Sequence, residues 1–296
     1  MKIGIIGLGI MGYHAALKLM EHPFDVHGYD PFPRAANRAV KAGVKLVVSP
    51  EALAAVSGCI LLFTPGPKET EDVITGENGI LNCVRAGLVV ANMSTVDPDT
   101  NIRMAGLLAA KGVGLIDSPV LGRPVGVGTW AFPVGGDAKH IDVARPVLTV
   151  LGGSEDKIFY VGPLGSGNKL KLLSNMMFGA INACAAEIMA LAHHLGVSQK
   201  TLVEVAIAGN AGALSNLYKE IGNRIVENRY HDPSFTVDLL IKDNYLCLEM
   251  ARKANLPMVL GNAVDYLNRM ASLNGLGAED NASMWKAVSK VWGGKQ

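Results

Sequence analysis

Short apolar runs alternate with helical patterns over residues 1–164. This alternation predicts an α/β domain in which parallel strands are joined by crossover helices on both faces of one sheet. Turn residues such as Gly, Pro and Asp separate the runs. The expected strands are Lys2–Ile6, Asp25–Tyr29, Leu46–Val48, Cys59–Phe63, Leu88–Asn92, Val113–Ser118, Ala131–Val134 and Lys157–Tyr160.

The strand pattern stops at Gly165, and apolar residues then recur at helical spacing to the end of the chain. The expected helices lie near 166–195, 198–208, 213–228, 235–254, 257–274 and 278–291. We therefore predict two domains, residues 1–164 and 165–296, the second all-helical and beginning with one long helix over 165–196.

The long helix is apolar almost all round, which predicts that it is buried. At about 100° per residue, Lys171, Asn175 and Asn182 fall on one stripe. Other faces carry apolar side chains, namely Leu172, Leu173, Met176, Met177, Ile181 and Leu191. A buried amine is costly unless it is paired or neutral, so Lys171 is a candidate for chemistry. The alternative is that Lys171 extends its amine to water from the first turns.

A glycine motif, Gly7-Leu8-Gly9-Ile10-Met11-Gly12, follows the first strand and opens a helix. This spacing gives a tight turn, a close approach to a pyrophosphate and close helix packing, and the helix N-terminus attracts phosphate charge. Asp30 ends the second strand, where a carboxylate can accept hydrogen bonds from ribose hydroxyls. We expect a Rossmann-type domain that prefers NAD, because Asp30 repels a 2′-phosphate. The nearby Arg34 leaves NADP possible.

Two later loops leave the sheet at the same edge, where open α/β sheets bind ligands. The first contains Thr64 and Pro65, and the second contains Ser94 and Thr95. All four residues are candidate cofactor contacts, although either loop could be an ordinary turn.

A long Gly- and Pro-rich loop, Asp117–Thr129, follows the sixth strand. Backbone amides in such a loop can bind an anion closely. Arg123 adds a guanidinium suited to a carboxylate, sulfonate or phosphate. The alternative is a surface arginine beside a kinked connection.

The charge balance and the cysteine spacing argue against several classes of function. The 27 Lys and Arg residues are balanced by 26 Asp and Glu, so no basic field favours nucleic acid or an anionic membrane. The four cysteines show no zinc-ligand spacing, and we expect them to be reduced and buried in a cytoplasmic protein without a metal. The glycines in the N-terminal apolar run favour a strand over a signal peptide. The most apolar window, Met176–Ala192, contains Glu187 and Asn182, which argues against a membrane span.

Four stretches in order resemble the β-hydroxyacid dehydrogenase family, which includes 3-hydroxyisobutyrate dehydrogenase and tartronate semialdehyde reductase. They are the glycine motif, the D-x-P-V-x-G loop at Asp117–Gly122, the pattern Gly165-x-Gly167-x-x-x-Lys171-x-x-x-Asn175, and Lys242-Asp243. The resemblance spans nearly the whole chain. It implies a dinucleotide-binding domain, a long interdomain helix, and a helical domain used in dimer or tetramer contacts.

The resemblance also implies roles for individual residues. Lys171 corresponds to the catalytic lysine and Asn175 to the neighbour that helps hold substrate. Lys242 corresponds to a lysine that reaches the nicotinamide end of the site. Gly122 and the residue after it correspond to the segment that binds the acidic group of the substrate.

The segment Leu121-Gly122-Arg123 departs from the serine and two glycines usual in hydroxyisobutyrate enzymes, and the loop is about two residues shorter. Compared with those enzymes, this segment lacks the serine hydroxyl and carries an additional cation, Arg123. Arg123 could therefore favour a stronger or bulkier anion, as in the sulfolactaldehyde reductases, and substrate identity does not follow from the family.

The expected activity is hydride transfer between NAD and a small β-hydroxyacid or its semialdehyde, with Lys171 as general acid and base. A free lysine, with a pKa of ~10.4, is a poor base near neutral pH, so the site is expected to lower it. Lys169 lies about 200° round the helix and cannot face the same site. Two alternatives remain: imine reduction on the same fold, against which Lys171 counts, and a catalytically silent dinucleotide-binding scaffold.

Overall fold

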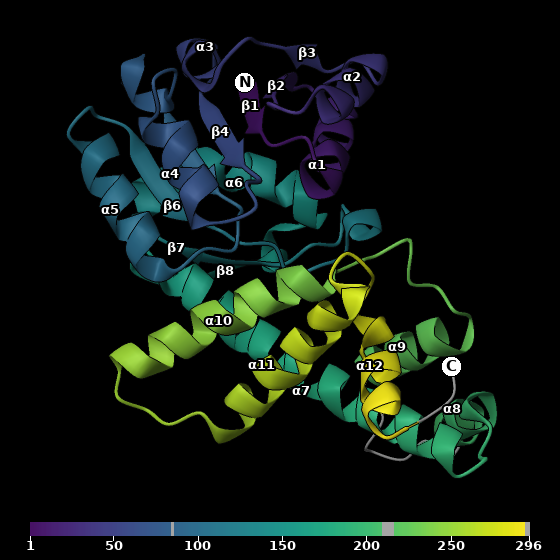
Figure 1. Ribbon diagram of the computed structural model, residues 1–296. Helices are drawn as coiled ribbons and strands as arrows, with labels where there is room; N and C mark the ends of the chain where they lie inside the picture. Colours follow the sequence, from purple (N-terminus) through teal and green to yellow (C-terminus); the bar gives the residue numbers. More distant parts are fainter. Residues whose placement is uncertain (84–85, 209–215, 294–296) are drawn as a thin grey trace. The chain divides into compact units, whose positions relative to one another are not determined.

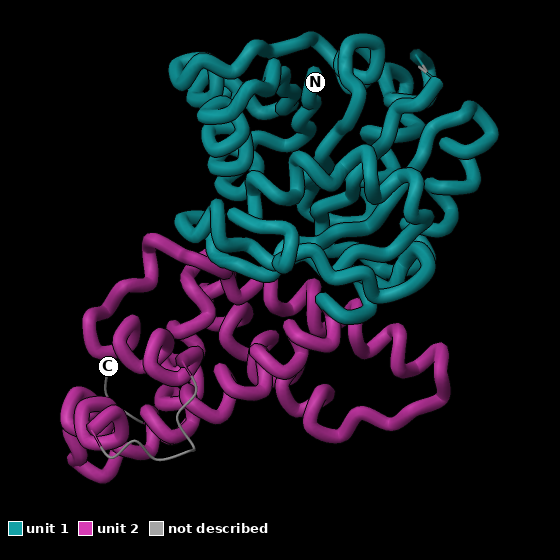
Figure 2. Tube along the Cα trace, turned by 180° about the vertical axis from the view of Figure 1, so that it is seen from behind, with its two compact units in different colours: residues 1–171 teal, residues 172–296 magenta. Residues whose placement is uncertain are grey.

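The computed structural model describes residues 1–83, 86–208 and 216–293. The chain forms two compact units, residues 1–171 and 172–296 (Figure 2). The first unit contains a sheet with helices on both faces, and the second contains helices (Figure 1).

All eight predicted strands occur, with ends shifted by no more than two residues. They form one sheet in the order β3-β2-β1-β4-β5-β6-β7-β8. Their bounds are β1 Lys2–Ile6, β2 Asp25–Tyr29, β3 Lys45–Leu46, β4 Cys59–Leu62, β5 Val89–Asn92, β6 Gly114–Asp117, β7 Phe132–Gly135 and β8 Ile158–Gly162.

The sheet departs from the predicted all-parallel arrangement at one pair, because β7 runs antiparallel to β6, with Asp117 opposite Gly135. Residues 118–131 contain only the short 3₁₀ turn Pro124–Gly126 and no crossover helix, so the chain returns along the neighbouring strand in reverse. The remaining pairs are parallel.

Successive residues of β1 face opposite sides of the sheet and belong to different cores. Ile3 and Ile5 lie in one hydrophobic cluster with residues of α1 and α6, and Ile6 lies in the other with residues of α3 and α5. The covering helices are α1 Ile10–Met20, α2 Pro33–Lys41, α3 Pro50–Val56, α4 Pro67–Thr75, α5 Pro98–Ala109 and α6 Ala138–Gly152. This two-sided burial is the arrangement that the apolar strands predict.

The second half is helical, as predicted. Its elements are α7 Ser166–His194, α8 Gln199–Ala208, α9 Asn216–Val226, α10 Val237–Lys253, α11 Val259–Ala271 and α12 Met284–Val291. The predicted helix 213–228 begins at residues 213–215, which lie outside the described residues. The helix expected from 278 begins only at Met284, after Asp280, whose carboxylate accepts from the N–H of Ala282 in a short 3₁₀ turn.

The prediction that the long helix is buried on all faces is wrong. Leu173, Met177, Ile188 and Leu191 are 43–66% exposed in the single chain. The opposite side of α7 is buried and carries small residues. Gly179 illustrates this, because a Cβ there would lie 2.9 Å from Asn244 on α10 and 3.0 Å from Val264 on α11. Close packing therefore occurs on one side, and the larger apolar residues lie on the other.

By length and composition, α7 is apolar enough to span a membrane, but half of its most apolar window is buried within the protein. This is also the behaviour of a core helix. The prediction of buried cysteines holds for Cys59 and Cys247 and is wrong for Cys184, which is exposed, and Cys83, which is half-buried. Cys184 lies on the exposed side of α7, between Met177 and Ile188.

Candidate functional site

The glycine loop between β1 and α1 has a different constraint at each glycine. Gly7 has φ +89°, and a Cβ there would lie 2.2 Å from the carbonyl oxygen of Phe63. A Cβ on Gly12 would lie 1.9 Å from the carbonyl oxygen of Gly7, so α1 packs directly on the loop. No described atom lies within 4 Å of a Cβ on Gly9. The loop is therefore tight at both ends and open in the middle, next to the N-terminus of α1, as a dinucleotide phosphate requires.

The Asp30 carboxylate is hydrogen-bonded to the same loop. Its Oδ2 accepts from the N–H of Leu8 at 2.7 Å, and its Oδ1 accepts from the N–H of Phe32 at 2.8 Å. The guanidinium of Arg38 donates to the carbonyl oxygen of Leu8 at 2.8 Å and lies 4.3 Å from the centre of the Tyr13 ring. These contacts fix the carboxylate beside the glycine loop, where ribose hydroxyls lie in Rossmann-type sites.

The two loops after β4 and β5 meet, as their shared edge predicts. The Ser94 hydroxyl accepts from the N–H of Thr64 at 2.7 Å and lies 2.9 Å from the Thr64 hydroxyl. Ser94 is buried, Thr64 and Thr95 are half-buried, and Pro65 is exposed. Thr64 and Ser94 are therefore hydrogen-bonded to one another, and Pro65 is the most exposed member of the group.

The loop that contains Arg123 contacts the side chain of Trp130. The fully buried indole donates from Nε1 to the carbonyl oxygen of Arg123 at 2.7 Å. A Cβ on Gly122 would lie 2.4 Å from the same ring. Leu121 pairs with Ala131 through two backbone hydrogen bonds of 2.9 and 3.0 Å. Glycine is thus required at position 122, and the backbone at Arg123 is held while its side chain remains half-buried.

Lys171 lies in the second turn of α7 and is half-buried, whereas Lys169 is exposed. This difference agrees with the expected placement of the two lysines on opposite sides of the helix. Asn182, for which the sequence predicts no role, is fully buried and donates to the carbonyl oxygen of Asn281 at 3.1 Å. Its contact is with the helical unit.

Asn175 and Lys242 contact the same carboxylate within residues 172–296. The Asn175 amide donates to Asp243 Oδ2, and Lys242 Nζ lies 2.7 Å from Asp243 Oδ1. Asp243 is 2% exposed. One N–H of the Asn175 amide is thereby engaged, which leaves its second N–H as a donor and its oxygen as an acceptor.

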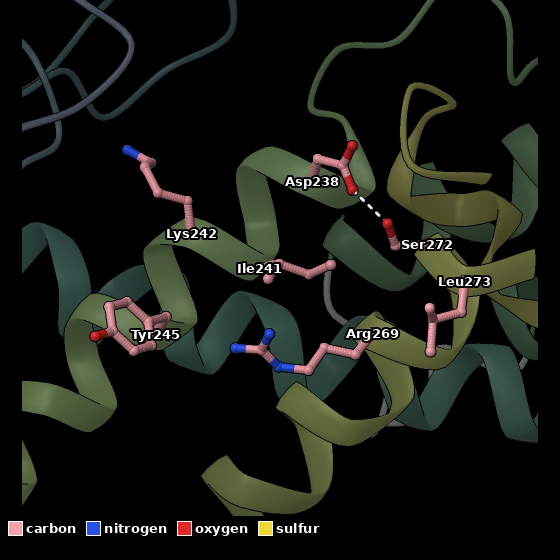
Figure 3. A pocket seen from close by; sticks show the side chains of 7 residues that line it. All are labelled: Asp238, Ile241, Lys242, Tyr245, Arg269, Ser272 and Leu273. Carbon is pink, nitrogen blue, oxygen red and sulfur yellow. Dashed lines mark hydrogen bonds between the residues drawn. The ribbon is translucent and has the colours of Figure 1, made fainter. Parts of the chain in front are cut away.

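A cavity of about 490 Å³ lies beside Lys242, between α10 and α11 (Figure 3). Its lining residues are Asp238, Ile241, Lys242, Tyr245, Arg269, Ser272 and Leu273. Ser272 donates to Asp238 at 2.7 Å, and Arg269 Nε donates to Asp265 at 2.6 Å. Both cations of this cavity, Lys242 and Arg269, are paired with carboxylates.

Sequence reasoning assigned no role to Arg38, Trp130 or Asp243. Trp130 follows the glycines of the Arg123 loop, and Asp243 is adjacent to Lys242, so proximity to a motif was the available signal. For Arg38 the sequence offered no such signal, because Arg38 contacts Leu8, 30 residues earlier, only in the folded chain.

Two family models match the chain in order. Residues 2–162 match the NAD-binding domain of 6-phosphogluconate dehydrogenase. Residues 165–288 match the model described as "NAD-binding of NADP-dependent 3-hydroxyisobutyrate dehydrogenase". Together they cover the glycine loop and the segment with Lys171.

Named relatives align over nearly the full length. The chain is 30% identical to 2-(hydroxymethyl)glutarate dehydrogenase of Eubacterium barkeri, covering 98% of this chain and 94% of that protein. It is 31% identical to L-threonate dehydrogenase of Cupriavidus necator, covering 96% and 95%.

Solved structures share the fold. A 3-hydroxyisobutyrate dehydrogenase from Salmonella typhimurium superposes with a TM-score of 0.87 at 24% identity, covering 96% of this chain and 99% of that one. An imine reductase from Pseudomonas sp. superposes less well, with a TM-score of 0.59 at 22% identity, covering 97% and 99%. The glycine loop, the full-length match and the fold agree, and the chain belongs to the β-hydroxyacid dehydrogenase family of NAD(P)-dependent oxidoreductases.

Proposed function

We propose that this protein interconverts a small β-hydroxyacid and its semialdehyde, with Lys171 as the general acid and base. The observation that carries the proposal is the half-buried Lys171 in the second turn of α7, one helical turn before Asn175. The names of the relatives support the substrate class, because each describes a hydroxylated carboxylic acid.

The residues of the glycine loop fit NAD(P). The proposed phosphate-binding segment consists of Gly7, Leu8, Gly9, Ile10, Met11 and Gly12. Asp30 is the proposed ligand of the ribose hydroxyls. Thr64, Pro65, Ser94, Thr95 and Lys242 are the further proposed contacts. When bound, the nicotinamide supplies the hydride acceptor or donor.

The chain's own residues handle the proton and the orientation of the substrate. In oxidation the Lys171 amine takes the proton of the substrate hydroxyl, and in reduction it returns that proton to the forming alkoxide. The second N–H of the Asn175 amide donates a hydrogen bond to the substrate oxygen, so Asn175 orients this oxygen without competing for its proton. Leu121, Gly122 and Arg123 bind the acidic group, with the Arg123 guanidinium as the charged partner.

A spectrophotometric screen at 340 nm tests the activity. NAD and NADP are each offered with 3-hydroxyisobutyrate, 2-(hydroxymethyl)glutarate, threonate, glycerate and a sulfonated analogue. Cyclic imines with NADPH test the imine reductase alternative. Turnover of imines alone, or NADH binding without any turnover, would replace the proposal by one of the two alternatives.

Lys171→Ala tests the acid–base role, and Lys169→Ala is its matched control, because Lys169 lies two residues earlier with an exposed side chain. We expect kcat to fall at least a hundredfold in the first variant and to stay within twofold of wild type in the second. The Kd for NADH should be unchanged in both. Full turnover by Lys171→Ala would refute the role.

Asp30 is proposed to set a preference for NAD over NADP. Asp30→Ser removes the carboxylate that repels a 2′-phosphate, so the ratio of NADP to NAD activity is expected to rise at least tenfold. Arg34→Ala should leave the ratio unchanged. If Arg34→Ala instead abolishes NADP use in the wild-type background, Arg34 is the selecting residue.

We further propose a cytoplasmic homo-oligomer that assembles through the exposed side of α7. Leu173, Met177, Ile188 and Leu191 fall within about 60° of one another on the helix, and a contiguous apolar stripe of this kind marks an interface. Light scattering after size exclusion should give a dimer or tetramer. Met177→Glu with Ile188→Glu should give a monomer, while Val48→Glu, at an exposed position in the other unit, should not.

A further inference from the structure

The first turn of α7 begins without a capping side chain of its own. The residue before the helix is Gly165, which has φ +90° and offers no side-chain acceptor. The N–H groups at the start of a helix need partners outside the helix. At this helix the N–H of Ser166 donates to the nearby carbonyl oxygen of Pro163 at 3.0 Å, whereas the N–H groups of Gly165 and Asn168 have a partner from a distant part of the sequence.

Asp117, at the end of β6, supplies the missing cap. Its Oδ1 accepts from the N–H of Gly165 at 2.7 Å, and its Oδ2 accepts from the N–H of Asn168 at 2.6 Å. One carboxylate thus satisfies both N–H groups that a capping box normally shares between two side chains. Asp117 is fully buried, and burial raises its pKa to about 6, against the lowering effect of the N–H groups of Asn168 and Gly165.

Gly167 allows this close approach. A Cβ at this position would lie 2.4 Å from the carbonyl oxygen of Pro133 and 2.8 Å from the carbonyl oxygen of Asp117. Any larger residue would push the helix away from the strands. The two glycines before Lys171 therefore have separate causes, a positive φ at Gly165 and a backbone contact at Gly167.

Asn168 connects the same turn to a second strand. Its side chain is fully buried, and its Oδ1 accepts from the N–H of Val96 at 3.0 Å. Val96 follows Ser94 and Thr95, the loop after β5 that we propose to contact the coenzyme. The turn that precedes Lys171 is thus bonded to the ends of both β5 and β6, and all of these residues belong to the unit 1–171.

We propose that Asp117 and Asn168 are positioning residues that hold the first turn of α7 against the ends of β5 and β6 and so set the place of the Lys171 amine. Lys171 follows Asn168 by three residues, less than one turn, so movement of that turn moves the amine. This inference rests on the proposed role of Lys171. Misplacement of a catalytic group by 1 Å can reduce turnover a hundredfold.

The test uses Asn168→Ala and Asp117→Asn in the full chain. Asn182→Ala is the matched control, because Asn182 is an equally buried amide on the same helix, far from Lys171. Hydrogen exchange of the amides of residues 166–171 is measured without substrate, together with kcat, KM and the Kd for NADH.

We expect exchange at residues 166–171 to become at least tenfold faster in both variants and to remain unchanged in Asn182→Ala. We also expect kcat to fall 10- to 100-fold, with KM and the Kd for NADH within about threefold of wild type. A merely structural role would lower stability in all three variants without separating kcat from KM.

Unchanged exchange at residues 166–171 in both variants would overturn the inference. So would faster exchange with wild-type kcat, provided that Lys171→Ala is inactive. Full activity of Lys171→Ala would instead overturn the proposed function, and the catalytic purpose of the capping contacts with it, whatever the exchange rates are.

Discussion

A single added methyl group distinguishes the role of Gly9, in the β1–α1 loop, from that of Gly12, in the first turn of α1. Gly9→Ala places the methyl where no described atom lies within 4 Å, and the φ of −59° at Gly9 suits alanine. Gly12→Ala places it 1.9 Å from the carbonyl oxygen of Gly7. The first change should therefore affect only what binds above the loop, and the second should affect the fold itself.

The expected magnitudes follow from these distances. Overpacking costs about 1–3 kcal/mol, and Gly12→Ala belongs at the upper end because the opposing atom is backbone and cannot rotate away. About 3 kcal/mol corresponds to a fall in Tm of roughly 6–12 °C for a unit of this size. Gly9→Ala should change stability by no more than about 0.5 kcal/mol. Loss of one charge-assisted hydrogen bond to the pyrophosphate costs about 1.5–3 kcal/mol, which raises the Kd for NADH about 10- to 100-fold.

Differential scanning fluorimetry and NADH fluorescence titration measure the two effects separately. Gly106→Ala is the control, since it adds a methyl group at another open glycine, in α5. Wild-type NADH affinity in Gly9→Ala at unchanged Tm would refute the placement of the pyrophosphate over Gly9. A fall in Tm as large as that of Gly12→Ala would refute the open space.

Three further predictions concern contacts around the site. Because burial raises the pKa of Asp117 from 3.8 to about 6, the folded state binds more protons than the unfolded state between these values, and stability falls as pH rises. Urea titrations from pH 4 to 7 should show wild type losing about 3 kcal/mol relative to Asp117→Asn; a flat difference contradicts the shift. Trp130→Phe removes the donor to the Arg123 carbonyl, so initial rates should show KM rising about three- to tenfold at constant kcat, and an unchanged KM would exclude this support. Arg38→Ala removes the hydrogen bond to Leu8, and the Kd for NADH should rise about tenfold in fluorescence titration while substrate KM stays constant; equal effects on both would indicate general loosening.

The sheet and its order of elements were predictable because each strand of the first half is an apolar run ended by a turn residue. The antiparallel pairing of β7 was not, since it depends on the absence of a crossover helix between Asp117 and Phe132. The exposed side of α7 was also missed. Composition gives the number of apolar residues on a helix, but which face packs depends on the elements that contact it, such as α10 and α11 at Gly179.

For the candidate site, the sequence predicts a role where a residue type implies its own chemistry, as for the glycine loop, Asp30 and Lys171, and these roles stay predictions. Residues that act through others were not predictable. Asn168 is one of the unspecified positions in the pattern Gly165-x-Gly167-x-x-x-Lys171. Its contact is with the N–H of Val96, 72 residues earlier, and the pattern gives no sign of this contact. Asp117 belonged to a recognised loop, but its contact with Gly165 exists only in the folded chain.

The boundary between the two compact units falls inside α7, between Lys171 and Leu172, and not in a loop. Chimeras that exchange the units between homologues must therefore be joined within a continuous helix. Each residue inserted or deleted at the joint changes the helical phase by about 100° and the length by about 1.5 Å. Laboratory recombination should accordingly tolerate substitutions across this joint and reject small insertions, so a crossover has to conserve residue spacing between Lys171 and Asn175.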